Sequence, residues 1–229
     1  MEGIPKNCVV KNNYTIIDDT LLVEEHVLDK LSKSILNAMK KVKQVEFGRF
    51  FNGEVDGKIP DNVEIIFFGK HFNSTIDKLP KNLKVLTLER EFEQRVDNLP
   101  EGLEDLELGE QFNNPIDNLP NSLKILRLGD EFDHPVDFLP RQLEVLRLGW
   151  SFTGSLDNLP PTLRKLSLEA EYEGSLDNLP DSIKTLRIPF YKKKIKKLPS
   201  SLKKIYIQDE YKFRLPKGDY KKFYVNDDY

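Results

Sequence analysis

Apolar residues recur along most of this chain with a period of 20 residues. Each period carries a proline that follows Leu or Ile, and these prolines are Pro60, Pro80, Pro100, Pro120, Pro140, Pro160 and Pro180. Counted from each proline, apolar residues stand at positions +3, +6, +8, +12, +16 and +19, with Asp at +17 and often Gly at +9. The chain is therefore built from one short unit that is repeated, and each unit needs its neighbours to bury its apolar side.

The spacing of the first apolar positions, L-x-x-L-x-L, predicts one short strand in each unit. Residues +5 to +8 form this strand, with the side chains at +6 and +8 pointing inward and those at +5 and +7 outward. The rest of each unit is too short for a helix and contains proline, which favours extended or polyproline II backbone. We therefore predict a mainly β repeat solenoid, a leucine-rich-repeat-like arc with about ten parallel strands on one face and extended returns on the other. The last strand would span Tyr220, Phe223 and Val225.

The first 38 residues do not match the repeat, and part of this segment has helical spacing. An amphipathic helix over about residues 20–40 is predicted, with a candidate N-cap among Asp18, Asp19 and Thr20, and it would cover the open end of the first repeat. A short strand at residues 14–17 would precede it. We thus expect one domain, with an N-terminal cap at residues 1–38, repeats at 39–216, and a terminal strand and tail at 217–229. The apolar positions of the helix are Val23, Val27, Leu28, Leu31, Ile35, Leu36 and Met39.

Composition excludes several classes of function. No run of about 18 apolar residues would span a membrane, and the first residues lack the apolar region of a secretion signal. The single Cys8 cannot form an intramolecular disulfide, which fits a reducing cytoplasm. Three scattered histidines and the lack of any catalytic motif lead us to expect no metal, no cofactor and no enzymatic activity.

The Phe-Asn pair that follows many strands carries a resemblance to a known family. The sequence Phe112-Asn113-Asn114-Pro115-Ile116 is similar to the signature of the FNIP-repeat family, a leucine-rich-repeat relative, and weaker copies begin at Phe51, Phe72 and Phe132. The resemblance covers about residues 39–216. It implies a non-enzymatic repeat scaffold of the kind found in social amoebae and in giant DNA viruses of amoebae, so a viral member would act in the host cytoplasm. Several members join such repeats to an F-box, which implies substrate recognition for a ubiquitin ligase as an alternative function.

The recurring Asp at +17 would place carboxylates side by side in stacked repeats. A cation site is conceivable there, but Asp before Asn-Leu-Pro also accepts hydrogen bonds from nearby backbone N–H groups in an Asx-type turn, and a row of unbalanced carboxylates would repel itself. We therefore interpret these residues as turn residues. They are Asp56, Asp77, Asp97, Asp117, Asp137, Asp157 and Asp177.

The outward strand positions are where a repeat protein can vary without damaging its core. Several of them combine arginine or aromatic side chains with apolar neighbours, as the energetically dominant residues of protein interfaces do. They could equally form cross-strand pairs without binding anything. We predict that an unidentified protein partner binds this strand face, through Phe67, Arg127, Arg147, Trp150 and Arg187.

The end of the chain is basic although the whole is slightly acidic. The formal net charge of −3 divides into +8 for residues 181–229 and −11 for residues 1–180. A basic patch there could contact nucleic acid, which is a further alternative function, or could be a solvated rim that guards the sheet edge. The open edge also leaves a monomer or an edge-paired homodimer as alternatives. The patch consists of Lys192, Lys193, Lys194, Lys196, Lys197, Lys203 and Lys204.

Overall fold

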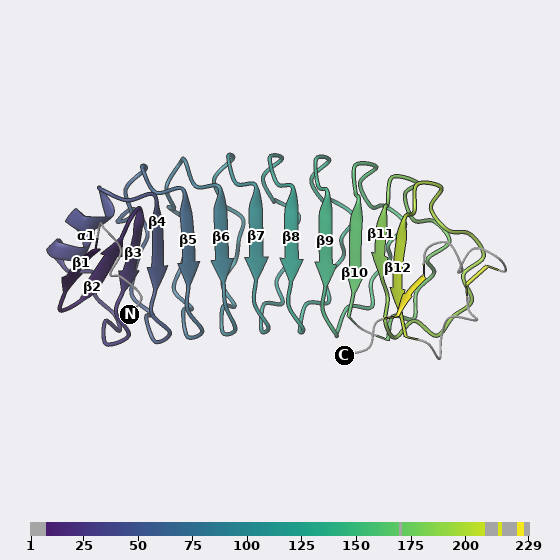
Figure 1. The fold of residues 1–229 in the computed structure, drawn as a ribbon, viewed down its shortest axis with the longest axis horizontal. Coiled ribbons are helices and arrows are strands. Elements are labelled where there is room, and N and C mark those ends of the chain that lie inside the picture. Colours follow the sequence, from purple (N-terminus) through teal and green to yellow (C-terminus); the bar gives the residue numbers. More distant parts are fainter. Residues whose placement is uncertain (1–7, 170, 209–214, 217–223, 227–229) are drawn as a thin grey trace, which may run out of the picture. The chain divides into compact units, whose positions relative to one another are not determined.

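The computed structural model describes residues 8–169, 171–208, 215–216 and 224–226. The chain divides into two compact units, an N-terminal unit of residues Met1–Phe112 and a C-terminal unit of residues Asn113–Tyr229. Figure 1 shows the strands of each unit side by side in chain order. No helix in the part of the chain that the structure describes is long and apolar enough to cross a membrane.

The N-terminal unit begins with an antiparallel meander that leads into parallel strands. Strands β1 (Cys8–Lys11), β2 (Tyr14–Ile17) and β3 (Thr20–Val23) pair antiparallel in this order. Strand β3 then pairs parallel with β4, the first strand of the repeats. The parallel series continues as β4 (Gln44–Phe47), β5 (Ile65–Phe68), β6 (Val85–Leu88) and β7 (Asp105–Leu108).

The predicted strand at residues 14–17 is confirmed, but the predicted helix over residues 20–40 is wrong in extent. The only helix among the described residues, α1 (Lys33–Met39), is seven residues long, and its N-cap is Ser32, whose hydroxyl accepts a hydrogen bond from the N–H of Ile35. Residues 20–23 belong to β3 because they pair with strands on both sides and thereby extend the sheet beyond the first repeat. Leu28, which the prediction places on the apolar helix face, is 54% exposed.

The C-terminal unit contains the remaining strands of the repeats. Within this unit, each described strand pairs parallel with the next one along the chain. The strands are β8 (Ile125–Leu128), β9 (Val145–Leu148), β10 (Lys165–Leu168), β11 (Thr185–Arg187), β12 (Lys204–Ile207) and β13 (Tyr224–Asn226). Within the described residues the repeats therefore contribute β4 to β13, in agreement with the prediction, although Tyr220 and Phe223 of the last predicted strand lie outside them.

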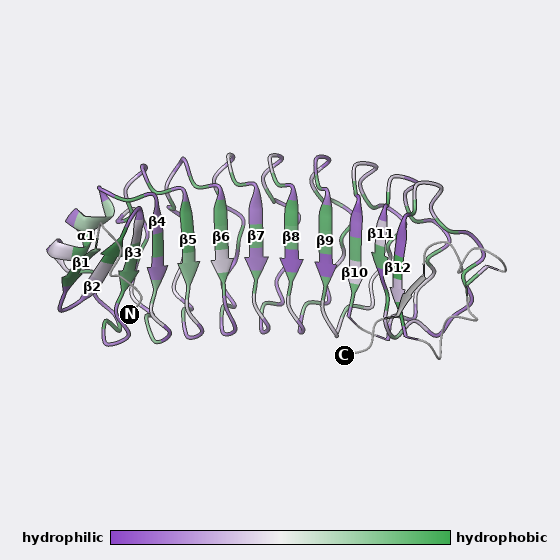
Figure 2. Cartoon of the chain, viewed as in Figure 1, coloured by the Kyte–Doolittle hydropathy of each residue, from purple (hydrophilic) through white to green (hydrophobic). Residues whose placement is uncertain are grey.

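The apolar periodicity maps directly onto the core of each unit. Residues at +6 and +8 are buried while those at +5 and +7 are partly exposed, as in β6, whose residues Leu86 and Leu88 are fully buried. The returns hold no helix in the described residues, which confirms a solenoid that is mainly β. Figure 2 shows that the strands differ in hydropathy: β5 is largely green and β7 largely purple.

The aromatic residue at +12 forms a stack on the return side of the core. In the N-terminal unit the ring centroids of Phe72 and Phe92 are 6.2 Å apart and those of Phe92 and Phe112 are 6.3 Å apart. In the C-terminal unit Phe132, Phe152 and Tyr172, with Tyr191 at +11 of its repeat, form a stack with centroid distances of 6.4, 6.1 and 6.5 Å. These rings are buried, so within each unit one aromatic side chain per repeat packs against that of the next repeat.

The Asn that follows this aromatic residue joins successive repeats through the backbone. The side-chain oxygen Oδ1 of Asn73 accepts hydrogen bonds from the N–H of Glu93 at 2.9 Å and from Nε2 of Gln94 at 3.0 Å. Asp133 takes the same place in its own repeat and accepts from the N–H of Thr153 at 2.8 Å. The Phe-Asn pair of the sequence is therefore a structural device, with one residue for the core and one for the inter-repeat hydrogen bond.

Replacing Asn73 with alanine is expected to lower the free energy of unfolding by about 1 kcal/mol, because the N–H of Glu93 loses its acceptor. Asn73→Asp retains an acceptor oxygen and should stay within about 0.5 kcal/mol of the wild type, since Asp133 already occupies this place in another repeat. Urea denaturation of the three proteins measures the difference. Equal losses in the Ala and Asp variants would show that the accepted hydrogen bond is unimportant.

The glycines at +9 are required because successive repeats approach closely there. A Cβ atom on Gly149 would lie 2.3 Å from the carbonyl oxygen of Gly129, and one on Gly69 would lie 2.7 Å from that of Gly48. Such contacts are far inside van der Waals distance, so the backbone would have to shift. Inter-repeat packing therefore dictates glycine in these two repeats, whereas Glu89 and Glu169 occupy the same position in other repeats.

Candidate functional site

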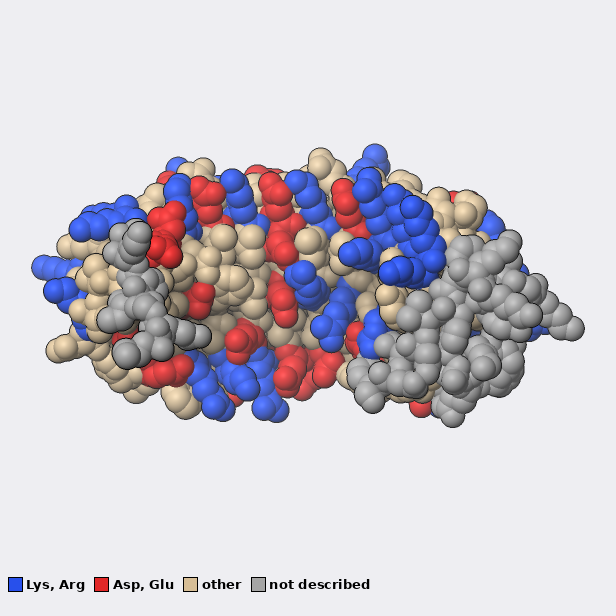
Figure 3. All heavy atoms as spheres, viewed as in Figure 1, with Lys and Arg blue, Asp and Glu red and all other residues tan. Residues whose placement is uncertain are grey.

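The outward side chains of the C-terminal strands form a basic surface. The +5 and +7 positions of β8 to β12 hold no Asp or Glu. In Figure 3, Lys and Arg atoms gather on the strand face over this part of the chain. On β4 to β7 of the N-terminal unit, by contrast, the same positions carry Glu46, Asp105 and Glu107 and no Lys or Arg. The basic residues at these positions of β8 to β12 are Arg127, Arg147, Lys165, Arg187 and Lys204.

Three predicted partner-binding residues come together around one cavity, which we call the arginine cavity. Arg127, Arg147 and Arg187 project from β8, β9 and β11 and line a cavity of about 290 Å³. One lysine together with hydrophobic and hydroxyl-bearing residues completes the wall, so the arginine charges stand beside apolar surface. The other lining residues are Val145, Leu146, Lys165, Leu166, Ser167, Thr185 and Tyr206.

The remaining two predicted residues lie elsewhere. Trp150 is 51% exposed and does not line the arginine cavity; its ring packs against Phe190 with centroids 5.1 Å apart. Phe67 belongs to β5 in the N-terminal unit, where it lies in register with Glu46 and Thr87 of the adjacent strands. The structure thus brings Arg127, Arg147 and Arg187 together but does not place Trp150 or Phe67 in their cavity.

A buried acid that sequence reasoning missed holds two of these arginines. Glu169 is 6% exposed; it forms an ion pair with Arg187 and a second one with Arg147, whose Nε lies 3.4 Å from Glu169 Oε1. The Oγ of Ser167 also donates to Oε1 at 3.0 Å. Glu169 stands at +9, where most repeats have glycine, and this substitution was the available signal in the sequence.

The environment of Glu169 favours its ionised form. Burial alone would raise its pKa, but the hydrogen bond and charge of Arg187, the hydroxyl of Ser167 and the charge of Arg147 outweigh burial and lower the pKa below its ordinary value. Glu169 is therefore a carboxylate at neutral pH. It orients Arg147 and Arg187 and neutralises part of their charge.

The predicted basic patch is largely occupied by ion pairs, three with the preceding repeat and one, between Lys197 and Asp181, within the same repeat. Lys192 pairs with Glu171, Lys193 with Glu173 at 3.3 Å, Lys196 with Asp177 at 3.5 Å and Lys197 with Asp181 at 3.7 Å. The backbone N–H of Lys196 also lowers the pKa of Asp177, and that of Ser200 lowers the pKa of Asp181. Four lysines of the run from Lys192 to Lys197 are thus paired with acids, whereas Lys203 and Lys204 line a second cavity.

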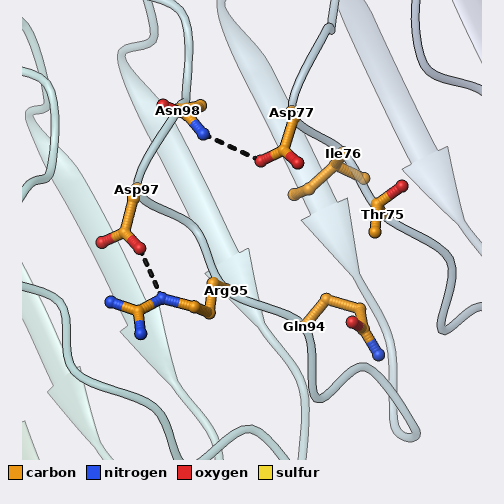
Figure 4. A pocket seen from close by; sticks show the side chains of 7 residues that line it. All are labelled: Thr75, Ile76, Asp77, Gln94, Arg95, Asp97 and Asn98. Carbon is orange, nitrogen blue, oxygen red and sulfur yellow. Dashed lines mark hydrogen bonds and ion pairs between the residues drawn. The ribbon is translucent and has the colours of Figure 1, made fainter.

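The aspartates at +17 bond to the following repeat. Nδ2 of Asn98 donates to Oδ1 of Asp77 at 2.9 Å, which Figure 4 shows in a hollow that also contains the ion pair between Arg95 and Asp97. Asn178 donates in the same way to Asp157, and this hydrogen bond is the main reason that the pKa of Asp157 is lowered.

These contacts correct the expected Asx-type turn, because the backbone N–H groups that donate to Asp56 and Asp177 lie one repeat further along. The donors to Asp97 and Asp157 within their own repeats are side chains, of Arg95 and Ser155. Stacking brings position +18 of one repeat beside +17 of the preceding one, so side chains bridge repeats instead of closing a local turn. No group of three His, Cys, Asp or Glu residues able to hold a metal ion occurs among the described residues.

Comparison with known families and structures fits this architecture. The model of the FNIP Repeat family matches residues 95–131 and 112–151, which include the Phe112-Asn113 signature. The chain contains FNIP repeats. FNIP and leucine-rich-repeat folds are typically non-enzymatic scaffolds, and folds of this kind commonly mediate protein–protein interaction.

Two solved structures resemble this FNIP-repeat chain over most of its length. One is CroV588, described as a novel circular LRR protein, with 30% sequence identity and a TM-score of 0.79 over 86% of this chain. The chain covers only 32% of CroV588. The other is InlP of Listeria monocytogenes, with 17% identity and a TM-score of 0.54, covering 83% of this chain and 62% of that one; this likeness shows the fold alone. No curated protein sequence is significantly similar to the chain.

Proposed function

We propose that this chain is a non-enzymatic interaction module whose C-terminal unit binds an acidic segment of a partner protein on its strand face. The observation that carries the proposal is the convergence of Arg127, Arg147 and Arg187 on one cavity with apolar walls. Arginine binds carboxylates in a bidentate geometry and also stacks on flat or apolar groups, so it suits a protein interface better than a solvated surface.

The positive charge of the strand face favours a partner segment that is acidic. Because β8 to β12 present basic and no acidic residues at their outward positions, an acidic segment gains attraction along several strands at once. Val145 and the ring of Tyr206, which stand at outward positions in the cavity wall, favour an apolar side chain between the partner's acids. The partner sequence should therefore alternate acidic with aliphatic or aromatic residues.

A peptide-display selection on the purified wild-type chain tests this proposal. Selected peptides should be enriched in Asp and Glu next to Leu, Phe or Tyr. The double substitution Arg127→Glu, Arg147→Glu should lower the affinity for a synthetic selected peptide at least tenfold, because it turns attraction into repulsion at the cavity. Circular dichroism and thermal melting establish that the variant is folded.

A matched control makes the same change of charge elsewhere. Arg90 and Arg95 of the N-terminal unit form exposed ion pairs with Glu110 and Asp97. The double variant Arg90→Glu, Arg95→Glu should keep the affinity for the peptide within about twofold of the wild type, because exposed ion pairs away from the cavity contribute little to stability or to peptide binding. Selected peptides without acidic residues, or equal losses in both double variants, would refute the proposed strand-face function.

A further inference from the structure

The position immediately before each repeat strand, which we call the pre-strand position, alternates in charge along the chain. Within the N-terminal unit this alternation forms ion pairs. Oε1 of Glu64 lies 2.7 Å from Nζ of Lys43, and Oε2 of Glu64 lies 3.1 Å from Nζ of Lys84. Within the C-terminal unit Nε of Arg164 lies 3.7 Å from Oε2 of Glu144. In chain order the pre-strand residues are Lys43, Glu64, Lys84, Glu104, Lys124, Glu144 and Arg164.

The alternation ends after Arg164, because the next pre-strand residues, Lys184 and Lys203, are again basic. Figure 3 shows blue groups standing together over β10 to β12 at one edge of the strands. Parallel strands lie about 4.8 Å apart, so three cations in successive strands face one another at short range. An anion beside Arg164, Lys184 and Lys203 would therefore reduce the repulsion between these three cations.

A cavity of about 480 Å³ lies at this break, and we call it the lysine cavity. No acid belongs to its lining in the part of the chain that the structure describes. Thr185 lies in register between Lys165 on one side and Lys204 on the other, so a hydroxyl donor stands between two ammonium groups. The lining consists of Arg164, Lys165, Lys184, Thr185, Lys203, Lys204 and Tyr206.

We propose that the lysine cavity binds a compact ligand that carries two or more phosphate groups. Several cations, a hydroxyl and a phenol from three adjacent strands match the many acceptor oxygens of clustered phosphates, which a single carboxylate cannot engage. The cavity also has the size of a small-molecule site, for which about 300–1,000 Å³ is typical. This site goes beyond the proposed partner surface, although Lys165, Thr185 and Tyr206 line both cavities.

The surroundings favour a compact ligand over a nucleic-acid strand. A strand of nucleic acid would need a basic track leading away from the cavity. The lysines from Lys192 to Lys197 could have supplied this track, but four of them already pair with neighbouring acids, namely Glu171, Glu173, Asp177 and Asp181. The formal net charge of the whole chain is also −3, which disfavours a long polyanion.

Calorimetric titration of the full chain with inorganic tripolyphosphate at about pH 7 and roughly 0.15 M salt tests this site. The wild type should bind one tripolyphosphate per chain, at least tenfold more tightly than monophosphate. Lys184→Glu should reduce the affinity at least tenfold while keeping or raising the melting temperature, because it restores the alternation by placing an acid between Arg164 and Lys203. This stability readout separates loss of the site from loss of the fold.

Lys124→Glu is the matched control, since it makes the same change of charge at a pre-strand position outside the lysine cavity. The affinity of this variant for tripolyphosphate should stay within about twofold of that of the wild type. The proposal is overturned if the wild type does not bind tripolyphosphate, if Lys184→Glu binds like the wild type, or if Lys124→Glu loses as much affinity. A single-stranded RNA 20-mer that binds more tightly than tripolyphosphate would overturn the assignment to a compact ligand. None of these results depends on whether acidic peptides bind the arginine cavity.

Discussion

Replacing Phe92 with alanine is expected to lower the free energy of unfolding by about 3–5 kcal/mol. Phe92 is fully buried, and its ring lies between those of Phe72 and Phe112 at centroid distances of 6.2 and 6.3 Å. Truncation removes buried apolar area, leaves a cavity and breaks the aromatic stack on both sides. Since each repeat contacts only its neighbours, two inter-repeat contacts weaken together.

Chemical denaturation and amide hydrogen exchange measure this effect. Exchange should accelerate most in β6 and β7, because the loss is confined to the repeats next to Phe92. Phe138→Ala is the control: Phe138 is 72% exposed, so its removal should change stability by less than about 0.5 kcal/mol. Similar losses in the two variants would mean that the aromatic stack contributes little to stability.

The interior of the repeats could be predicted from the sequence because a 20-residue period repeated many times leaves one consistent assignment. Strand positions, inward residues and the buried aromatic at +12 all follow from it, as Leu86, Leu88 and Phe92 show. The N-terminal segment occurs once, and there the apolar spacing was ambiguous. Val23 fits a helix face together with Val27, but it also fits the inward face of a strand together with Leu21, and the pairing of β3 with strands on both sides shows that the segment is a strand.

The candidate site was predictable only in part, because its chemistry depends on contacts between repeats. The three arginines could be identified since they recur at +7, an outward position. Glu169 was missed because the sequence does not tell that an acid at +9, where glycine is frequent, reaches the arginines of two strands. The pairing of Lys192 with Glu171 was likewise hidden, since the net charge of a segment does not tell which charges meet across repeats.

Replacing Glu169 with glutamine is expected to lower the free energy of unfolding by about 2–3 kcal/mol at pH 7, because Arg187 loses its charged partner in a largely buried place. The pKa of Glu169 is lowered in the folded state, so ionisation of this carboxyl stabilises the fold above the ordinary pKa of 4.5. This contribution disappears as the pH falls through the lowered pKa. The difference between wild type and Glu169→Gln should therefore be largest near neutral pH and shrink in acid.

Urea denaturation between about pH 7 and about pH 3 tests this expectation. Glu110→Gln is a suitable control, because Glu110 also pairs with an arginine, Arg90, but both side chains are more than half exposed. Its effect should be below about 0.5 kcal/mol at every pH. A pH-independent difference for Glu169→Gln would show that the Glu169 carboxylate is not the stabilising form.

The same substitution has the opposite effect on the proposed partner surface. Glu169 neutralises part of the charge of Arg147 and Arg187, so Glu169→Gln leaves both arginines more attractive to an acidic peptide. If the arginine cavity is the binding surface, a variant that is less stable should bind the selected peptide more tightly. A purely structural role of the arginines predicts no gain in affinity, because loosening the fold can only weaken binding. Peptide titration of Glu169→Gln therefore decides whether Glu169 restrains a binding site or only completes the packing of β10 and β11.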